Sequence, residues 1–397
     1  MASLTLEAIA VEARPVTDRF VAAGHQLYLV GGIVRDLILE RDVSADVDLD
    51  VTTDATPEQI KSLIAPLADA LWLQGEKFGT IGARIGAREY EITTHRHEVY
   101  VADSRKPAVS FSTAIDEDLS RRDFTVNAMA IELPSRELFD TFGGRSDLRE
   151  LRLRTPLDAE TSFMDDPLRM LRAARFTAGY GLKPAEGVLE AMVALASRLD
   201  IVSAERLRDE LDKLLAVPAP SSGLELLADT GLLARFLPEV GAVVARNGEL
   251  AEVDDVEADP ELRLAVLFSD VDVAAVVPRL RALRYSNARR KNVAMVLRGA
   301  AALAGGAVVS PPEFRRWVAA VGTLREKSRR VVEVTVADGP TKVAQSRALE
   351  AELAEELDDL GPGLTGAEVL ELLGRGQGLE VGAAIDYLQE LRFEAGP

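Results

Sequence analysis

The chain has 397 residues, which is too many for one ordinary hydrophobic core and therefore predicts two to four domains. It contains no cysteine, which excludes disulfide bonds, thiolate zinc sites and cysteine nucleophiles. The formal net charge of −19 argues against a nucleic-acid partner only as an average, because basic residues gather in 279–298 and 325–330 while acidic residues gather in 249–261 and 350–359.

The first segment, residues 3–24, has the apolar spacing of an amphipathic helix with a break at Pro15. Its early acidic residues, with no basic stretch before an apolar core, argue against a signal peptide. The chain has no run of about eighteen apolar residues, so we expect no membrane-spanning helix. Together with the lack of cysteine, these features favour a cytoplasmic protein without a membrane or disulfide partner.

The stretch from Leu27 to Thr53 predicts a strand, a glycine pair, a helix and a second strand. The predicted elements are the strand Leu27–Val30, the helix Ile33–Glu40 and the strand Asp46–Val51. The glycines between the first strand and the helix, Gly31 and Gly32, would let the backbone come close to a phosphate group.

Three aspartates, Asp46, Asp48 and Asp50, alternate along the second strand, and alternation places them on one face of a sheet. Carboxylates on one face repel one another but suit Mg²⁺, which takes carboxylate oxygens together with substrate phosphates. We therefore predict a magnesium site for chemistry on a nucleotide. The alternative interpretation is a solvated edge strand.

The next segment predicts a helix and then short strands separated by glycines. The helix runs from the capping residue Thr56 to about Ala65. The strands are Ala70–Leu73, Thr80–Ile85 and Glu89–Thr94. Glycines between such strands are typical of hairpins, so the sheet is predicted to be mixed or mainly antiparallel. Glu91 is either a third carboxylate of the metal site or a surface glutamate.

Residues 93–107 are polar, end in a proline and are predicted to form a loop. Two histidines in this loop, His95 and His97, are too few to favour a histidine metal site. Further along, Arg121 and Arg122 either clamp a triphosphate, because guanidinium matches phosphate geometry, or form the solvated start of a helix.

From about residue 150 the pattern becomes helical. One predicted helix, Asp166–Phe176, carries charged residues spaced by three: Asp166, Arg169, Arg172 and Arg175. Successive members lie about 60° apart around the axis, so the stripe cannot converge on one point. It would line an extended ligand, with Asp166 and Arg169 presenting an acceptor and a donor to a base edge, or it is an exposed helix face.

The remaining pattern is also helical. Further helices are predicted over 204–216, 224–236, 261–268, 279–302 (one basic helix or a helix pair), 311–321, 331–357, 366–373 and 381–392. The chain is therefore predicted to be an α+β head followed by an all-helical remainder, in which the basic residues at 279–298 would form a phosphate-binding face.

Taken together, these segments resemble the family of class II tRNA nucleotidyltransferases and bacterial poly(A) polymerases, within the DNA polymerase β-like nucleotidyltransferase superfamily. The resemblance runs from Tyr28 to about Leu237 and is weaker beyond. Its motifs are LVGGIVRD, DLDVTTDATPE, FGTIGARIGAREYEITTHRHEVY, DLSRRDFTVNAMAI, DDPLRMLRAARF and SAERLRDELDKLL. It implies a catalytic head at 1–150, a helical neck with a nucleotide-selecting helix at 151–217, and a helical body and tail at 218–397 that bind tRNA.

The resemblance also implies roles for the candidate residues. Asp48 and Asp50 would be catalytic and bind Mg²⁺, whereas Asp46 falls outside the register that the motif VTTDATPE fixes. The residues implied to bind nucleotide are Gly32, Arg35, Arg122, Asp166, Arg169, Arg172 and Arg175. Among them, Asp166 and Arg169 would read the Watson–Crick edge of CTP or ATP.

Residues 262–272 depart from the family pattern. Many relatives carry a His-Asp pair of a metal phosphohydrolase domain near this position, whereas Phe268–Asp270 stands here. We therefore expect a degenerate relative of that region without its second activity. The tail at 381–391 resembles the helices that hold the tRNA elbow, and the loop at 95–107 resembles the one that helps relatives switch from C to A addition.

The sequence thus predicts a template-independent RNA nucleotidyltransferase that uses CTP and ATP to add CMP and AMP to the 3′ end of tRNA. Two alternatives stay open. One is a poly(A) polymerase or an enzyme restricted to CC or A addition. The other is a non-catalytic RNA-binding protein that kept the fold.

Overall fold

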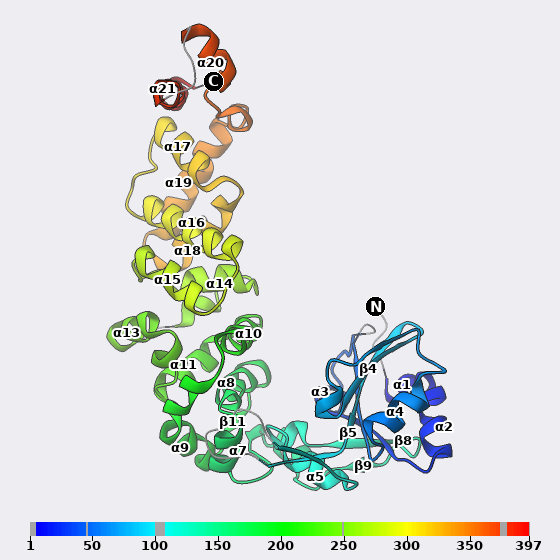
Figure 1. Cartoon of the computed structure of the whole chain (residues 1–397). Helices are drawn as coiled ribbons and strands as arrows, with labels where there is room; N and C mark the ends of the chain where they lie inside the picture. Colours follow the sequence, from blue (N-terminus) through cyan, green and yellow to red (C-terminus); the bar gives the residue numbers. More distant parts are fainter. Residues whose placement is uncertain (1–4, 45–46, 100–107, 248–249, 374–378, 397) are drawn as a thin grey trace. The chain divides into compact units, whose positions relative to one another are not determined.

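The computed structural model describes residues 5–44, 47–99, 108–247, 250–373 and 379–396 (Figure 1). Contacts between residues divide the chain into two compact units. Unit 1 comprises Met1–Val202 with Thr230–Leu232, and unit 2 comprises Ser203–Asp229 with Leu233–Pro397. Within the described ranges, every helix is too short or too polar to span a lipid bilayer. The finer division into head, neck and body stays a prediction.

Unit 1 is built around a mixed, mainly antiparallel sheet, which confirms the predicted fold class. The strand order is β3-β4-β5-β2-β1-β8-β9; β2 and β5 pair in parallel, and the other neighbouring pairs are antiparallel. The strands are β1 (Leu27–Val30), β2 (Leu49–Thr53), β3 (Ala70–Trp72), β4 (Thr80–Ile85), β5 (Arg88–Thr94), β8 (Ala130–Leu133) and β9 (Leu138–Phe139). Two further pairs are β6 (Arg96–Val99) with β7 (Ala108–Phe111), and β10 (Arg152–Leu153) with β11 (Lys183–Pro184).

One face of this sheet is apolar and covered by helices. Leu29, Val51 and Ile92 occupy neighbouring register positions on β1, β2 and β5, and all three are buried. Helix α2 contacts β1, and α4 contacts β4 and β5. Helix α1 lies with them beside the sheet (Figure 1). The helices of unit 1 are α1 (Leu6–Glu12), α2 (Arg14–Ala22), α3 (Gly32–Ile38), α4 (Pro57–Ile64), η1 (Glu76–Phe78), α5 (Ile115–Ser120), η2 (Thr125–Asn127), α6 (Gly144–Arg149), α7 (Ala159–Asp165), α8 (Leu168–Tyr180), α9 (Glu186–Ala194) and η3 (Ala196–Ile201).

The opposite face is covered in part. Tyr28 and Val30 of β1 pack there against Leu119 of α5 and Ala128, which follows η2. On the same face, β2 and β5 present the accessible side chains of Asp50 and Glu91. Because strand residues alternate, one segment such as β2 supplies both a buried core and an open functional surface.

Among the elements predicted around the sheet, the strand at Asp46–Val51 and the loop at 93–107 differ from the structure. The strand predicted at Asp46–Val51 begins only at Leu49, so Asp48 precedes it, and Asp46 lies outside the described residues. The loop predicted at 93–107 contains strand β6, whereas residues 100–107 lie outside the described ranges. Strand β6 has no alternating apolar pattern of its own; it forms because β7 pairs with it.

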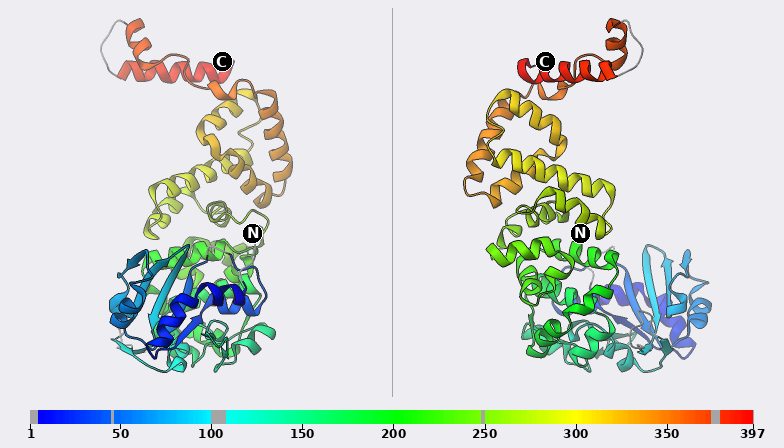
Figure 2. Two further views of the ribbon diagram at one scale, coloured as in Figure 1. Left: turned by 90° about the vertical axis from the view of Figure 1, so that its right-hand side faces the viewer. Right: turned by 60° about the vertical axis from the view of Figure 1, so that its left-hand side comes forward.

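Unit 2 is entirely helical in its described part, as the sequence predicts (Figure 2). Its central helix α16 contacts α14, α15, α17, α18 and α19. A Cβ atom at Gly299 of α16 would lie 2.5 Å from Ser328 Oγ, so glycine permits the close approach of α18. The helices are α10 (Ala204–Leu215), α11 (Ser221–Asp229), α12 (Leu233–Phe236), α13 (Pro238–Asn247), η4 (Ala251–Val253), α14 (Pro260–Leu267), α15 (Val273–Ala282), α16 (Asn287–Ala304), α17 (Pro311–Val321), η5 (Gly322–Leu324), α18 (Arg325–Thr335), α19 (Gly339–Glu352), η6 (Leu357–Asp359), α20 (Gly366–Leu373) and α21 (Leu379–Ala395).

Candidate active site

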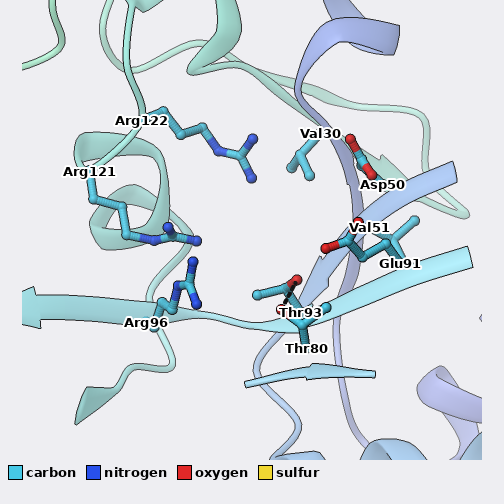
Figure 3. Close-up of a pocket in the computed structure, with 9 residues that line it drawn as sticks. All are labelled: Val30, Asp50, Val51, Thr80, Glu91, Thr93, Arg96, Arg121 and Arg122. Atoms are coloured by element: carbon cyan, nitrogen blue, oxygen red, sulfur yellow. Dashed lines mark hydrogen bonds between the residues drawn. The ribbon is translucent and has the colours of Figure 1, made fainter. Parts of the chain in front are cut away.

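A polar pocket of about 180 Å³ opens on the accessible part of the sheet face in unit 1 (Figure 3). Two carboxylates, Asp50 and Glu91, lie on one side of it, and three guanidinium groups point toward it from the other (Figure 3). The residues that line it are Val30, Asp50, Val51, Thr80, Glu91, Thr93, Arg96, Arg121 and Arg122. The pocket therefore has an acidic wall and a basic wall.

The acidic wall follows from the register of two parallel strands. Asp50 of β2 lies directly across from Glu91 of β5, so both side chains project from the same face. Desolvation by the surrounding protein, then the charges of Glu91 and Asp48, raise the pKa of Asp50 to about 6, although Arg122 opposes the shift. The structure thus brings Glu91, one of the two sequence alternatives, into the pocket beside Asp50.

This donor set fits a hard divalent cation. Asp50 and Glu91 place two carboxylates on neighbouring strands, and a cation would offset both their mutual repulsion and the desolvation that chiefly raises the pKa of Asp50. Within the described ranges, no three His, Cys, Asp or Glu side chains form a cluster that could hold a metal ion. Two carboxylates are nevertheless enough for Mg²⁺, which commonly completes its shell with substrate phosphates and water.

The basic wall is organised by a buried aspartate of α5. Asp118 is fully buried and accepts hydrogen bonds from Arg121 Nη2 at 2.6 Å and from Arg122 Nη2 at 3.1 Å. Burial alone would raise the pKa of Asp118, but the two arginines outweigh it and hold that pKa at about 2. Asp118 is therefore ionised at neutral pH and fixes both arginines beside the pocket.

Gly31 joins the two walls. Its φ of 78° is strained for residues with a side chain. A Cβ atom there would lie 3.4 Å from Arg122 Nη1 and 3.6 Å from Asp50 Oδ2. At the next position, a Cβ atom on Gly32 would lie 3.3 Å from Arg35 Nη2. The glycine pair therefore lets the backbone lie close to these charged side chains, and the predicted approach to a phosphate group stays a prediction.

Arg35, a predicted nucleotide contact, is only 6% exposed. It donates to Asn127 Oδ1 at 2.7 Å and to Asp36 Oδ1 at 3.0 Å, and it also donates to the Tyr180 hydroxyl. Its guanidinium carbon lies 4.1 Å from the centroid of the Tyr180 ring. Arg35 therefore braces α3 against α8 and η2.

The charged stripe predicted on one helix is divided in the structure. Helix α8 begins at Leu168, and Asp166 lies before it with an extended backbone at φ −139° and ψ 97°. The prediction that Asp166 is helical is wrong because a residue that precedes a proline, here Pro167, is pushed away from helical geometry. Asp166 Oδ1 accepts the Leu168 N–H at 3.2 Å.

The arginines of α8 are held by unit 1 itself. Arg169 is 9% exposed and donates to Ser162 Oγ at 2.7 Å and to the Arg121 carbonyl oxygen. Arg172 donates to the buried Asp123 at 2.7 Å. Burial raises the pKa of Asp123, but Arg172 and a hydrogen bond from Asn127 outweigh it and hold that pKa at about 2.

Arg175 has a different environment. Its guanidinium carbon lies 4.7 Å from the centroid of the Phe176 ring, and it does not line the pocket. The structure thus connects Arg169 to the basic wall through the carbonyl of Arg121, whereas Arg175 is not among the residues that line the pocket.

Three residues of this site, Asp118, Thr80 and Thr93, were not predicted from the sequence. Asp118 precedes Arg121 and Arg122 by three and four positions, and this helical spacing is a sequence signal for the ion pairs. Thr80 and Thr93 line the pocket with their hydroxyl oxygens 3.0 Å apart, but only the pairing of β4 with β5 brings them together.

Comparisons with known proteins show which family this chain resembles. Residues 27–154 match the family described as the poly A polymerase head domain, and residues 181–243 match the probable RNA and SrmB-binding site of polymerase A. The CCA-adding enzyme of Lactobacillus delbrueckii subsp. bulgaricus is 32% identical over 303 residues, which cover 75% of this chain and 74% of that one. The CCA-adding enzyme of Streptococcus gordonii is 38% identical over 244 residues, or 61% of this chain and 59% of that one.

Solved structures show the same likeness over nearly the whole chain. The Bacillus stearothermophilus CCA-adding enzyme in complex with CTP aligns with a TM-score of 0.77 and 28% identity, covering 97% of this chain and 93% of that one. The alignment includes both units, so the helical unit 2 is part of the shared architecture as well as the sheet.

Proposed function

The chain belongs to the family of CCA-adding enzymes, and from that premise we propose that it adds CMP and AMP to the 3′ end of tRNA, using CTP and ATP and releasing pyrophosphate. The observation that carries this proposal is the pocket in which Asp50 and Glu91 face Arg121 and Arg122 (Figure 3). Nucleotidyl transfer needs acids that hold a cation and arginines that hold phosphates. We also propose that the protein acts in the cytoplasm.

In this reaction the 3′ hydroxyl oxygen of the RNA bonds to the α-phosphorus of the bound nucleotide while the bond to pyrophosphate breaks. Arg121 and Arg122 would bind the triphosphate, because guanidinium groups pair with phosphate oxygens bidentately. Asp118 keeps both arginines in place before the nucleotide arrives. Such preorganisation lowers the cost of ordering side chains when the substrate binds.

Nucleotidyltransferases of this family are generally metal-dependent, and we propose Mg²⁺ as the ion. Asp50 would hold it together with Asp48, and Glu91 is a third candidate ligand. When bound, Mg²⁺ activates an attacking hydroxyl and neutralises a leaving pyrophosphate. The contribution of the chain is to present Asp50 without its proton, which requires a pH above its pKa of about 6.

The choice of nucleotide is proposed to depend on Asp166 and Arg169. Asp166 Oδ1 accepts a hydrogen bond from the Leu168 N–H. The Arg169 guanidinium donates hydrogen bonds to Ser162 Oγ and to the Arg121 carbonyl oxygen. A guanidinium has five N–H donors, so these contacts leave donors for a base edge. Gly32, Arg35, Arg172 and Arg175 complete the proposed nucleotide site, with Arg35 and Arg172 acting through the contacts that join α8 to η2 and α3.

The test uses a tRNA transcript that lacks its last three nucleotides. We would incubate it with CTP alone, ATP alone or both, in the presence of Mg²⁺, and sequence the products. We expect two C residues from CTP alone, and C-C-A when both nucleotides are present. Asp50→Asn should abolish addition while tRNA affinity persists, and Glu89→Gln, on the same strand as Glu91 but outside the pocket lining, should remain active.

Other products would identify the alternatives. Long A tails from ATP without C would indicate poly(A) synthesis, and an arrest after C-C or a requirement for C-C would indicate a restricted enzyme. If the protein binds RNA but incorporates no nucleotide, and Asp50→Asn does not change that binding, the protein is a non-catalytic RNA-binding protein.

A further inference from the structure

Two phenylalanine side chains remain exposed beside the pocket. Phe78, at the end of η1, is 41% exposed, and Phe111, at the end of β7, is 48% exposed. Aromatic rings contribute large amounts of apolar area, so folding normally buries them. Two accessible rings next to a site of nucleotide chemistry therefore suggest a ligand that stacks on them.

Both phenylalanines neighbour residues that line the pocket, although neither is itself a lining residue. Phe111 lies directly across from Arg96 in the β6–β7 pair, and Arg96 lines the pocket. Arg96 Nη1 donates to the Phe78 carbonyl oxygen at 2.6 Å. Thr80, another lining residue, follows Phe78 by two positions. Phe78 and Phe111 thus both neighbour Arg96, a residue of the pocket lining, and they do so from two different elements.

The backbone holds the Phe111 ring in a defined position. A Cβ atom at Gly79 would lie 2.9 Å from Phe111 Cε1, so the ring rests against the bare backbone of this glycine. Gly79 has a φ of 89°, which favours glycine independently of the ring. Its carbonyl oxygen accepts the Thr94 N–H at 2.8 Å, which ties this turn to β5. One side of Phe111 is therefore supported while the side chain remains accessible.

Positive charge accompanies the rings. Lys77 Nζ lies 4.9 Å from the centroid of the Phe78 ring, and Arg96, the register partner of Phe111, lines the pocket. Aromatic surfaces with nearby cations are what single-stranded nucleic acids recognise, because bases stack on rings while phosphates pair with cations. This combination favours an RNA strand over an apolar protein surface.

We propose that Phe78 and Phe111 form a stacking surface for the 3′-terminal bases of the acceptor RNA. The inference rests on the proposed function, since it assumes that the pocket joins a nucleotide to an RNA 3′ end. Stacking tolerates any base, because every base has a π face. Such tolerance suits an acceptor whose terminal base changes after each addition.

The test measures stacking directly. The acceptor is a tRNA transcript that lacks its last three nucleotides and carries 2-aminopurine, whose fluorescence falls on stacking, as its terminal base. We expect the wild-type protein to quench this fluorescence without added nucleotide, and Phe78→Leu and Phe111→Leu to reduce the quenching. Each change should raise the KM for RNA about 5- to 20-fold and leave the KM for CTP unchanged. Phe78→Tyr and Phe111→Tyr should retain the wild-type values, as should Leu157→Ala at a 52% exposed position of unit 1.

A second acceptor with an abasic terminal nucleotide separates stacking from a structural role. The wild-type protein should use it as poorly as the leucine variants use the intact RNA, and those variants should not distinguish the two acceptors. Equal wild-type KM values for both acceptors, or unchanged quenching in the variants, would overturn the proposal even if a variant fails to fold. Failure of the proposed function has another signature, which is the absence of incorporation by the wild-type protein.

Discussion

Asp50 has a pKa of about 6 because it is desolvated and faces Glu91 across two paired strands. In Glu91→Gln, the loss of one negative charge should lower the pKa of Asp50 by roughly 1 pH unit in the metal-free protein. Carbon-13 NMR of labelled aspartate carboxyl groups would follow this titration. Glu89→Gln is the matched control, because Glu89 lies on the same strand but is not among the charges that act on Asp50.

The same shift determines how stability changes with pH. A carboxyl whose pKa is raised by folding stabilises the folded state below its ordinary value, and that contribution is lost as pH rises through about 6. Metal-free Glu91→Gln should therefore be more stable than wild type at pH 8, and this advantage should shrink at pH 4. Thermal unfolding measures both; a lower melting temperature for the variant at pH 8 would contradict the argument.

Asp123 illustrates the opposite case, with a pKa held at about 2. Such a carboxyl stabilises the fold above its ordinary pKa, and the contribution is lost as pH falls through the folded value. Arg172→Met would leave Asp123 buried without its main cation, which should lower the free energy of unfolding by about 3 kcal/mol at pH 7. The loss should be smaller at pH 4, where the unpaired carboxyl can take up a proton.

Urea unfolding at the two pH values tests this prediction. Arg14→Met serves as its control, because Arg14 pairs with Asp18 at the surface with side chains 78% and 66% exposed. That change should cost less than about 0.5 kcal/mol at either pH. Equal losses for Arg172→Met at pH 7 and pH 4 would mean that packing, and not the charge of Asp123, is responsible.

At the scale of elements, the turn from β1 into α3 places Gly31 beside one charged side chain of each pocket wall. Gly31→Ala should impose strain at φ 78° and also push a methyl group toward Arg122 and Asp50. Gly24→Ala is a matched control, because Gly24 has a φ of 80° but no atom within 4 Å of the added Cβ. We expect both variants to lose about 1–3 kcal/mol of stability, but only Gly31→Ala to lose most of its nucleotide incorporation. Equal activity in the two variants would exclude a role for close approach at Gly31.

Elements also show how far the sequence leads. Alternation alone predicted that Asp50 lies on an accessible strand face, whereas Asp48, predicted on the same strand, precedes β2. The helical spacing of Asp118 with Arg121 and Arg122 was visible in the chain. The pairing of Asp50 with Glu91 was not, because it depends on the parallel register of β2 and β5. Local patterns specify which face a residue takes but not which distant strand becomes its neighbour.

The burial of the Arg35 side chain could not be predicted from the sequence either. Arg35 has the sequence context of an exposed helix residue, yet it is enclosed by Asn127 and Tyr180, which lie 92 and 145 positions away. By contrast, the position of Asp166 before its helix follows from Pro167 and could have been read from the sequence. The helix start at Asp166 could thus be corrected by a local rule, whereas the burial of Arg35 could be known only from the tertiary structure.

At the scale of the whole molecule, an acidic chain with a net charge of −19 must still hold a polyanion. Part of the basic segment at 279–298 is neutralised within unit 2, since Arg279 pairs with Glu239 and Arg289 pairs with Asp212. Two other cations of α16, Lys291 and Arg298, are exposed. Being seven residues apart, they lie on one face of the helix. The surface offered to RNA is therefore narrower than the sequence suggests.

Reversing these two charges should reveal how RNA is held. We expect the double variant Lys291→Glu and Arg298→Glu to bind tRNA about 10-fold more weakly at 0.1 M salt, because two phosphate contacts are lost. The slope of log affinity against log salt concentration should also fall by about 1 to 2, since fewer counterions are released. Fluorescence anisotropy of labelled tRNA across a salt series measures both. The double variant Arg149→Glu and Lys183→Glu makes the same change in net charge at exposed positions of unit 1. If both double variants weaken binding equally with the wild-type slope, net charge alone governs the affinity and α16 is not an RNA contact.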